Sequence, residues 1–275
     1  MIRSLGHLAI WPVFYTVGVL VLAMDLLAAR TVDWRACLFV GLCAHGCYLL
    51  DRVKASDARL DPADEIAQPE RYRFLRSRTM DLRSLIVLDM LIATVLASLI
   101  WEPLIPIPLI GAICVHFYAG RPASADRPRL KDLPAVKGVM IAGAHTALAA
   151  ATVIGITGSM RTFSDARSLL SLAIIFLIVF ADAVLCDLDD HDADRAYATK
   201  SMPVLIGRSP AWILAFTVHL FAGIVLIIHD HGSAGSIIFS CGVIATDAML
   251  TRVKRQRDWV DARLLPLAIL LVAFR

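Results

Sequence analysis

Residues 169–194 read LLSLAIIFLIVFADAVLCDLDDHDAD, a nearly continuous apolar run that ends in five aspartates. The run is long enough to form a helix that crosses a membrane. If the helix continues past Leu185, then Asp187, Asp190 and Asp194 lie at i, i+3 and i+7 and share one face. Carboxylates grouped in this way are ligands that Mg²⁺ accepts together with substrate phosphates. The alternative is a solvated acidic cap on the end of the helix.

The rest of the chain is also apolar. Of its 275 residues, 58% are hydrophobic and 19% are charged, whereas a soluble domain is about 45–50% apolar. This composition excludes a disordered chain and argues against a water-soluble globule. The net charge of +3 gives no case for nucleic acid as a partner. We therefore expect an all-α, polytopic membrane protein that forms one integral-membrane domain over residues 1–275.

Nine apolar segments are candidates for membrane spans. They are Leu8–Leu27, Ala36–Leu50, Ser84–Trp101, Leu104–Ala119, Ala135–Ile156, Leu169–Leu185, Ala211–His229, Ser233–Leu250 and Ala262–Phe274. The second, fourth and ninth are shorter than the roughly 20 residues that a full span needs. The first segment is longer than the apolar core of a signal peptide, so we expect it to be retained.

The distribution of Lys and Arg predicts how these spans are oriented. The four even-numbered loops (51–83, 120–137, 186–210 and 251–263) carry 21 of these residues, and the four odd-numbered loops carry four. Because basic loops stay in the cytoplasm, the N-terminus is predicted to be cytoplasmic and the C-terminus external. We expect an integral membrane protein of a bacterial-type inner or plasma membrane.

A shorter pattern of the same kind lies at the end of the second segment. Cys47 lies four residues before Asp51 at the end of the second segment, as Cys186 lies four residues before Asp190. Two helix ends of this kind could face each other across a bundle and share metal ions. The loop after Asp51 supplies more acids, among them Asp57, Asp61 and Asp64.

Basic residues between the fourth and fifth segments complete a possible anion site. Arg129, Lys131 and Lys137 are candidates for binding diphosphate oxygens, which take cations at close range, and Tyr118 lies just before them. Each could equally serve only to fix the topology. For the basic residues of the earlier loop we favour topology or contact with lipid headgroups; these are Arg71, Arg73, Arg76 and Arg78.

Four acids lie within the predicted spans, where ionisable groups are costly and often functional. Asp25 and Asp247 are near span ends and are expected to reach water. Asp182 is one turn from Cys186 and is expected to line the same cavity as the acidic motif. Asp89 has no partner that the sequence can identify.

Residues 186–207, CDLDDHDADRAYATKSMPVLIG, resemble the second aspartate-rich motif of the UbiA superfamily of intramembrane prenyltransferases. The family pattern is N-D-x-x-D-x-x-G-D followed by G-x-x-T-L-P-V-x-x-G. The aspartates of the pattern and part of its tail are present in register as Asp187, Asp190, Asp194, Pro203, Val204 and Gly207. Cys186 replaces the asparagine. The segment from Tyr118 to Gly138 resembles the basic segment that follows the fourth span in this family.

The first motif departs from the family pattern N-x-x-x-D-x-x-x-D. Cys47, Asp51 and Ala55 occupy its three slots, so Asp51 alone is preserved in register. Asp57 lies two residues late and could substitute for the carboxylate that is missing at Ala55. Without a substitute, the first metal site lacks ligands.

The resemblance implies a bundle of nine transmembrane helices around a cavity that opens to the cytoplasmic side. It implies Mg²⁺-dependent transfer of an isoprenyl group from a prenyl diphosphate to a lipophilic acceptor, such as an aromatic one, within the membrane. The implied metal ligands are Asp51, Asp57, Asp187, Asp190 and Asp194. Four of these (Asp51, Asp187, Asp190 and Asp194) would be catalytic, and the diphosphate would be bound by Lys131, Arg129, Lys137 and Tyr118.

Two alternatives remain open from the sequence. Loss of asparagine at both motif starts and of the carboxylate at Ala55 favours a diverged, non-catalytic member that binds a prenyl lipid or a partner protein. In-membrane acids would suit a transporter, but the acids here cluster at one end of the predicted bundle instead of at its midplane. The expected partners are a prenyl diphosphate, a lipophilic acceptor and membrane lipid, and no protein partner can be inferred.

Overall fold

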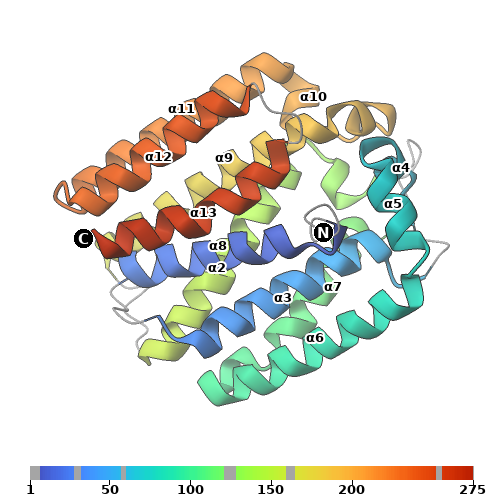
Figure 1. Cartoon of the computed structure of the whole chain (residues 1–275), viewed down its shortest axis with the longest axis horizontal. Helices are drawn as coiled ribbons and strands as arrows, with labels where there is room; N and C mark the ends of the chain where they lie inside the picture. The colour runs from blue at the N-terminus through green and yellow to red at the C-terminus, as the bar shows by residue number, and fades with distance from the viewer. Residues whose placement is uncertain are drawn as a thin grey trace.

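The computed structural model describes residues 7–27, 32–56, 60–120, 128–158, 165–251 and 256–274. Every regular element within these ranges is a helix (Figure 1). The long helices are α2 (Ile10–Leu26), α3 (Trp34–Val53), α6 (Thr79–Ile100), α7 (Ile107–Ala119), α8 (Val136–Thr157), α9 (Ala166–Ala196), α11 (Arg208–His229), α12 (Ala234–Leu250) and α13 (Gln256–Ala273). The short ones are α4 (Pro62–Ala67), α5 (Pro69–Arg76), α10 (Met202–Ile206) and the 3₁₀ turns η2 (Glu102–Leu104) and η3 (Leu130–Asp132).

Each of the nine apolar segments lies on one of the long helices. Among the described residues, six stretches are long and apolar enough to cross a membrane, namely α3, α6, η2 with α7, α8, α9 and α11. Helices α2 and α12 are apolar but shorter, and α13 contains Pro266 and begins with charged residues. The protein is an all-helical integral membrane protein, and the count of nine spans stays a prediction.

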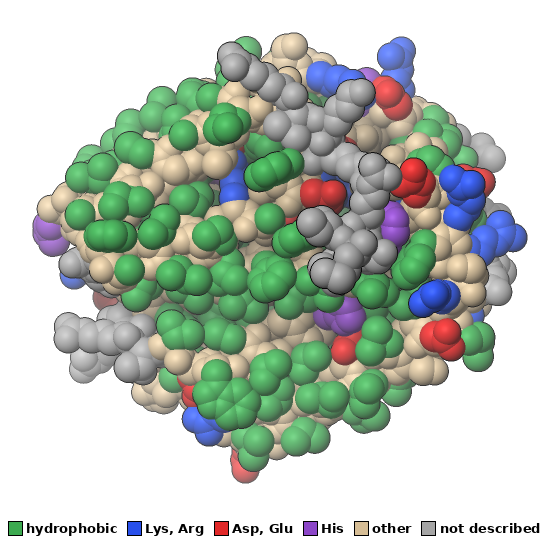
Figure 2. Space-filling view, viewed as in Figure 1, with side chains coloured by type: hydrophobic (Ala, Val, Ile, Leu, Met, Phe, Trp, Pro, Cys, Tyr) green, Lys and Arg blue, Asp and Glu red, His purple; other side chains and the backbone are tan. Residues whose placement is uncertain are grey.

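The outside of the bundle carries large apolar side chains. On α6, Val87, Leu91 and Val95 are each about three-fifths exposed, and Figure 2 shows apolar side chains over much of the long side of the bundle. Exposed apolar surface of this extent marks contact with a membrane or a partner. Because it runs along the hydrophobic helices, we assign it to lipid.

Helix α9 is the longest helix that the structure describes, with 31 residues. The Asp165 carboxylate caps its start by accepting a hydrogen bond from the Ser168 amide (2.9 Å). At about 1.5 Å per residue the helix is about 46 Å long, against roughly 30 Å for the hydrocarbon core of a bilayer. Its apolar part can therefore cross the membrane while the acidic motif extends beyond it. The helix does continue through residues 187–194, as the spacing predicts.

The short helices α4, α5 and α10 gather at the end of the bundle that holds the end of α9 (Figure 1). Charged side chains also collect at this end in Figure 2. The tail of the acidic motif forms α10, with Pro203 in its first turn. Gly207 separates α10 from α11 at φ 91° and ψ 158°, a conformation that is open to glycine and strained for other residues.

Asp182 and Asp247 belong to a buried polar network inside the bundle. Arg263 Nη1 donates to Asp247 Oδ1 (2.6 Å), and Arg263 Nη2 donates to Asp182. His219 Nδ1 contacts Asp247 Oδ2 (2.6 Å), and the Tyr15 hydroxyl donates to Asp182 Oδ2 (2.9 Å). The network joins α2, α9, α11, α12 and α13. The expectation that Asp247 reaches water is wrong, because its side chain is fully buried.

The other acids predicted within spans are also buried. Asp89 on α6 has a partner on α3, since His45 Nδ1 lies 2.7 Å from its Oδ2. His45 Nε2 lies 2.9 Å from the backbone oxygen of Leu8. Asp25 is 7% exposed, so the expectation that it reaches water is also wrong.

Helices α2 and α13 pack closely against each other at Gly18. A Cβ added there would lie 2.7 Å from the backbone nitrogen of Leu265 and 2.9 Å from the carbonyl carbon of Leu264. We expect Gly18→Ala to lower the free energy of unfolding by roughly 1–3 kcal/mol, because backbone cannot move aside as a flexible side chain can. Denaturant titration of the detergent-purified protein measures this.

Gly143→Ala is the matched control for Gly18→Ala. Gly143 lies inside α8 and has no neighbour within 4 Å of an added Cβ. Alanine there should be neutral or stabilising by up to about 1 kcal/mol, because it has the higher helix propensity. Equal effects of the two substitutions would contradict the close contact between α2 and α13.

Candidate active site

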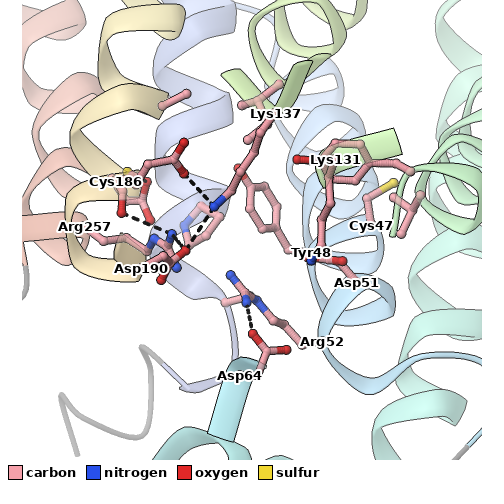
Figure 3. A pocket seen from close by; sticks show the side chains of 18 of the residues that line it. Cys47, Tyr48, Asp51, Arg52, Asp64, Lys131, Lys137, Cys186, Asp190 and Arg257 are labelled. Atoms are coloured by element: carbon pink, nitrogen blue, oxygen red, sulfur yellow. Dashed lines mark hydrogen bonds and ion pairs between the residues drawn. The ribbon is translucent and has the colours of Figure 1, made fainter. Parts of the chain in front are cut away.

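One cavity of about 250 Å³ lies among α2, α3, α7, α8, α9 and α13, beneath α4 and α5. Charged side chains from the ends of these helices line one part of it (Figure 3). Apolar and aromatic side chains, among them Tyr15, Met140, Ile141, His145 and Val179, line another part. The cavity thus joins a highly charged region to an apolar interior.

The second aspartate motif surrounds the ammonium group of Lys137. Its Nζ lies 2.7 Å from Asp187 Oδ1, 3.1 Å from Asp194 Oδ2 and 3.4 Å from Asp190 Oδ2. Lys137 is in the first turn of α8, and the three acids share the face of α9 that packs toward it. All three are buried, at 2–8% exposure, so the solvated-cap interpretation is wrong for them.

Arg257, at the start of α13, is a second cation on this motif. Its Nη2 donates to Asp190 Oδ2 (2.5 Å) and to the backbone oxygen of Cys186 (3.3 Å). Its backbone amide donates to Asp189 Oδ2 (2.9 Å). Figure 3 shows Asp190 between Arg257 and Lys137. This acid is therefore the central anion of the site.

The first motif faces the same cavity from the end of α3. Asp51 lines the cavity with Cys47 and Tyr48. The ammonium of Lys54 donates to Asp51 Oδ1 (2.8 Å), and the Lys54 side chain is almost fully buried. The two cysteine-aspartate helix ends of the sequence therefore face one cavity, but Asp51 already has a positively charged partner.

Arg129 and Lys131 lie at the cavity wall and bind Asp61, the residue that caps α4. Arg129 Nη1 and Lys131 Nζ both contact Asp61 Oδ2, the latter at 3.2 Å. Burial would raise the pKa of Asp61, but Lys131 and Arg129 outweigh it and hold the pKa below its usual range. Arg129 also makes a two-pronged contact with Asp132 (both 2.9 Å). The ion pairs of the Arg129 guanidinium thus connect the loop before α8 with the start of α4.

The predicted diphosphate ligands Tyr118, Arg129, Lys131 and Lys137 all line the cavity, as do Asp51, Asp187, Asp190 and Asp194. Asp182 lines it too, as expected. Asp57 lies outside the described residues. Asp61 and Asp64, the other acids of that loop, line the cavity and are each paired with arginine.

The two motifs differ in how well they suit Mg²⁺. Within the described ranges, no group of three or more His, Cys, Asp or Glu side chains is arranged to hold a metal ion. At the second motif the reason is Lys137, which occupies the point where three carboxylates converge. That donor set matches the oxygen ligands of Mg²⁺, so it fits one ion if the flexible lysine moves aside. Among the described residues, the first motif offers only Asp51, and this single carboxylate does not fit a second ion.

Sequence reasoning missed three arginines that line this cavity, which are Arg52, Arg71 and Arg257. The interpretation of Arg71 as a contact with lipid headgroups is wrong, because its side chain is 9% exposed; its role in topology stays a prediction. Arg73, Arg76 and Arg78 are exposed and remain consistent with that role. No signal in the sequence distinguishes Arg71 from the neighbouring arginines. The sequence likewise identifies Arg257 only as one of the basic residues of the loop 251–263.

Two solved structures resemble this chain over its whole length. A UbiA homolog from Archaeoglobus fulgidus bound to DMAPP and Mg²⁺ has a TM-score of 0.60 and 15% identity, covering 98% of this chain and 96% of its own. A digeranylgeranylglyceryl phosphate synthase has a TM-score of 0.55 and 12% identity, covering 100% and 99%. No family model and no curated protein matches the sequence. At these identities the likeness concerns the fold alone, and this chain has the fold of the UbiA homolog and of the synthase.

Proposed function

We propose that the protein transfers an isoprenyl group from a prenyl diphosphate to a lipophilic acceptor inside the membrane. The observation that carries this proposal is the cavity, in which Lys137 and Arg257 stand at the charged part and Tyr15 and Val179 at the apolar part. A prenyl diphosphate has the same division between a charged head and an apolar tail. The solved structure with DMAPP and Mg²⁺ supports the same substrate class by its fold.

In the proposed reaction the allylic C–O bond breaks and the diphosphate departs with the bonding electrons. Lys137 and Arg257 would stabilise the negative charge that develops on the leaving group. The aromatic rings of Tyr15 and Tyr48 and the apolar wall would stabilise the isoprenyl cation and exclude water. The acceptor then forms a bond to that carbon and loses a proton.

We propose that the Asp261 carboxylate accepts that proton as the general base. Its buried carboxylate lines the cavity, and its contact there is the Cys186 thiol, which lies 3.9 Å from Oδ1. Among the described residues it forms no ion pair. We therefore expect Asp261→Asn to slow transfer by about a hundredfold or more, the scale of general base catalysis, with unchanged binding of inorganic pyrophosphate. A parallel loss of both would contradict this assignment.

We propose that Mg²⁺ is held by Asp187, Asp190 and Asp194. When bound there, it would supply Lewis-acid stabilisation of the departing diphosphate. Asp51 would face the same diphosphate from α3, and Tyr118 and Lys131 would border it. An assay with labelled prenyl diphosphates tests both the acceptor class and the Mg²⁺ requirement.

The deciding experiment uses the full-length protein in lipid nanodiscs. Labelled prenyl diphosphates of several chain lengths are supplied with a membrane lipid extract, with Mg²⁺ or with EDTA. We expect a labelled lipid product and release of pyrophosphate. If every prenyl diphosphate remains intact with Mg²⁺ present, the enzymatic proposal is wrong.

One observation favours a second candidate function, a diverged binder of prenyl lipid. The acids of both motifs are already paired with Lys137, Arg257 or Lys54. A chain in this state could hold a prenyl diphosphate without cleaving it. Saturable binding of a labelled prenyl diphosphate without release of pyrophosphate would favour the binder over the enzyme.

We propose that the charged end of the bundle faces the cytoplasm. The proposal rests on the 21-to-4 distribution of Lys and Arg among the loops. Reporter fusions after Asp64 and after Arg195 should report a cytoplasmic location, and a fusion after Arg161 an external one. A reversed result at any of the three positions would contradict this orientation.

A further inference from the structure

The first motif lacks the carboxylates for a metal ion, and the described acids nearby do not replace them. Asp51 is bound by Lys54. Asp61 is bound by Arg129 and Lys131. Ala55 occupies the slot where the family pattern has an acid. Among the described residues, the groups that could neutralise a diphosphate at this side of the cavity are therefore cationic side chains.

Three guanidinium groups line the part of the cavity that lies between the two motifs. Arg52 comes from the end of α3, Arg71 from α5 and Arg257 from the start of α13. All three line the cavity and lie within electrostatic range of one another. Figure 3 shows Arg52 between Asp64 and the pair formed by Asp190 and Arg257.

This arginine cluster (Arg52, Arg71 and Arg257) has too few anionic partners. Arg52 and Arg71 share one oxygen of Asp64, with Nη1 of Arg52 at 2.5 Å and Nη2 of Arg71 at 3.8 Å. Arg257 shares Asp190 Oδ2 with Lys137. Among the described residues, the three guanidiniums thus share two carboxylates as ion-pair partners within 4 Å, and one of these also serves a lysine.

Two buried donors of the cluster lack a hydrogen bond. They are Nη2 of Arg71 and Nη1 of Arg257, and neither has an acceptor within the described ranges. Arg71 as a whole is 8% exposed. Burial and the neighbouring guanidinium of Arg52 lower the pKa of Arg71 to about 9. An anion with several oxygens can supply hydrogen-bond acceptors to buried cationic donors of this kind.

We propose that Arg52, Arg71 and Arg257 form a diphosphate-binding subsite that takes the place of the metal ion of the first motif. The inference rests on the proposed function for the identity of the anion. The protein then holds its substrate with one divalent ion, at Asp187, Asp190 and Asp194, and retains diphosphate affinity when that ion is removed. The arginine cluster neutralises the diphosphate oxygens that face α3, α5 and the start of α13.

The test measures diphosphate binding without metal. Calorimetry on the full-length, detergent-purified protein uses inorganic pyrophosphate in EDTA, and a separate arm uses an uncleavable prenyl thiolodiphosphate. The wild type should bind both in EDTA. Arg71→Gln and, independently, Arg257→Gln should each weaken that binding at least about tenfold, by loss of one charge-assisted contact.

Arg76→Gln is the matched control, because Arg76 lies on the same helix α5 and is exposed. It should bind pyrophosphate as the wild type does. Size-exclusion chromatography checks that each variant is folded. Because Arg71→Gln and Arg257→Gln are tested separately, the test remains valid if one of them fails to fold. Wild-type protein that binds nothing in EDTA, or cavity variants that equal Arg76→Gln, would overturn the subsite.

A count of bound metal provides a second readout. Electron paramagnetic resonance with Mn²⁺ and pyrophosphate should give one bound ion per chain, and two ions would overturn the proposal. The outcome for the subsite is separable from that for the enzyme. Arginine-dependent pyrophosphate binding without any transfer refutes the enzyme and keeps the subsite, whereas transfer with metal-free binding unchanged in Arg71→Gln refutes the subsite alone.

Discussion

Replacing Asp190 with Asn is expected to reduce isoprenyl transfer by at least about a hundredfold, the effect of removing one preorganised electrostatic contact. Asp190 Oδ2 accepts from both Arg257 (2.5 Å) and Lys137 (3.4 Å). Without the carboxylate charge, Arg257 loses the anion that pairs with it, Lys137 loses one of its three carboxylate partners, and the proposed metal site loses one of its three ligands. Asparagine keeps the shape of the side chain, so the helix should remain intact. The measurement is release of pyrophosphate from a labelled prenyl diphosphate.

Asp192→Asn is the control for this prediction. Asp192 lies two residues away on α9, with a side chain that is 78% exposed and that contacts Arg208 at 3.2 Å. Its substitution should leave transfer within about twofold, since exposed charges contribute little. Equal losses in the two variants would mean that the acidic run acts only through its overall charge, and the site assignment would fail.

Arg263→Met is expected to lower the free energy of unfolding by about 3–5 kcal/mol, the cost of removing one partner from a buried ion pair. The Arg263 side chain is 5% exposed and bridges Asp182 and Asp247. Its loss leaves two buried carboxylates without their guanidinium partner, and the His219 imidazole lies 2.6 Å from Asp247 and 3.5 Å from Asp182. Denaturant titration in detergent micelles, followed by circular dichroism, measures the change.

Arg208→Met provides the comparison for Arg263→Met. Arg208 is 54% exposed and pairs with the exposed Asp192. Its substitution should change the free energy of unfolding by less than about 1 kcal/mol. If the two variants unfold at the same denaturant concentration, the network between α9, α12 and α13 does not hold the bundle together.

Local sequence determined the helices and one face of the site. The apolar segments are long enough to specify helices in a bilayer, because backbone groups there must bond within their own segment. The i, i+3, i+7 spacing of Asp187, Asp190 and Asp194 fixed a common direction on α9. Both properties depend on residues a few positions apart, so they can be read without knowledge of the fold.

Tertiary structure alone decided which charges face the cavity. Arg71 and Arg76 have the same residue type and lie on the same short helix, yet one is buried at the cavity and the other is exposed. Arg257 reaches Asp190 across 67 positions of the chain. Asp247, which is near the end of its predicted span, is buried by Arg263 and His219. The physical reason is that hydropathy and helical spacing are local, whereas pairing of buried charges depends on how distant helices pack.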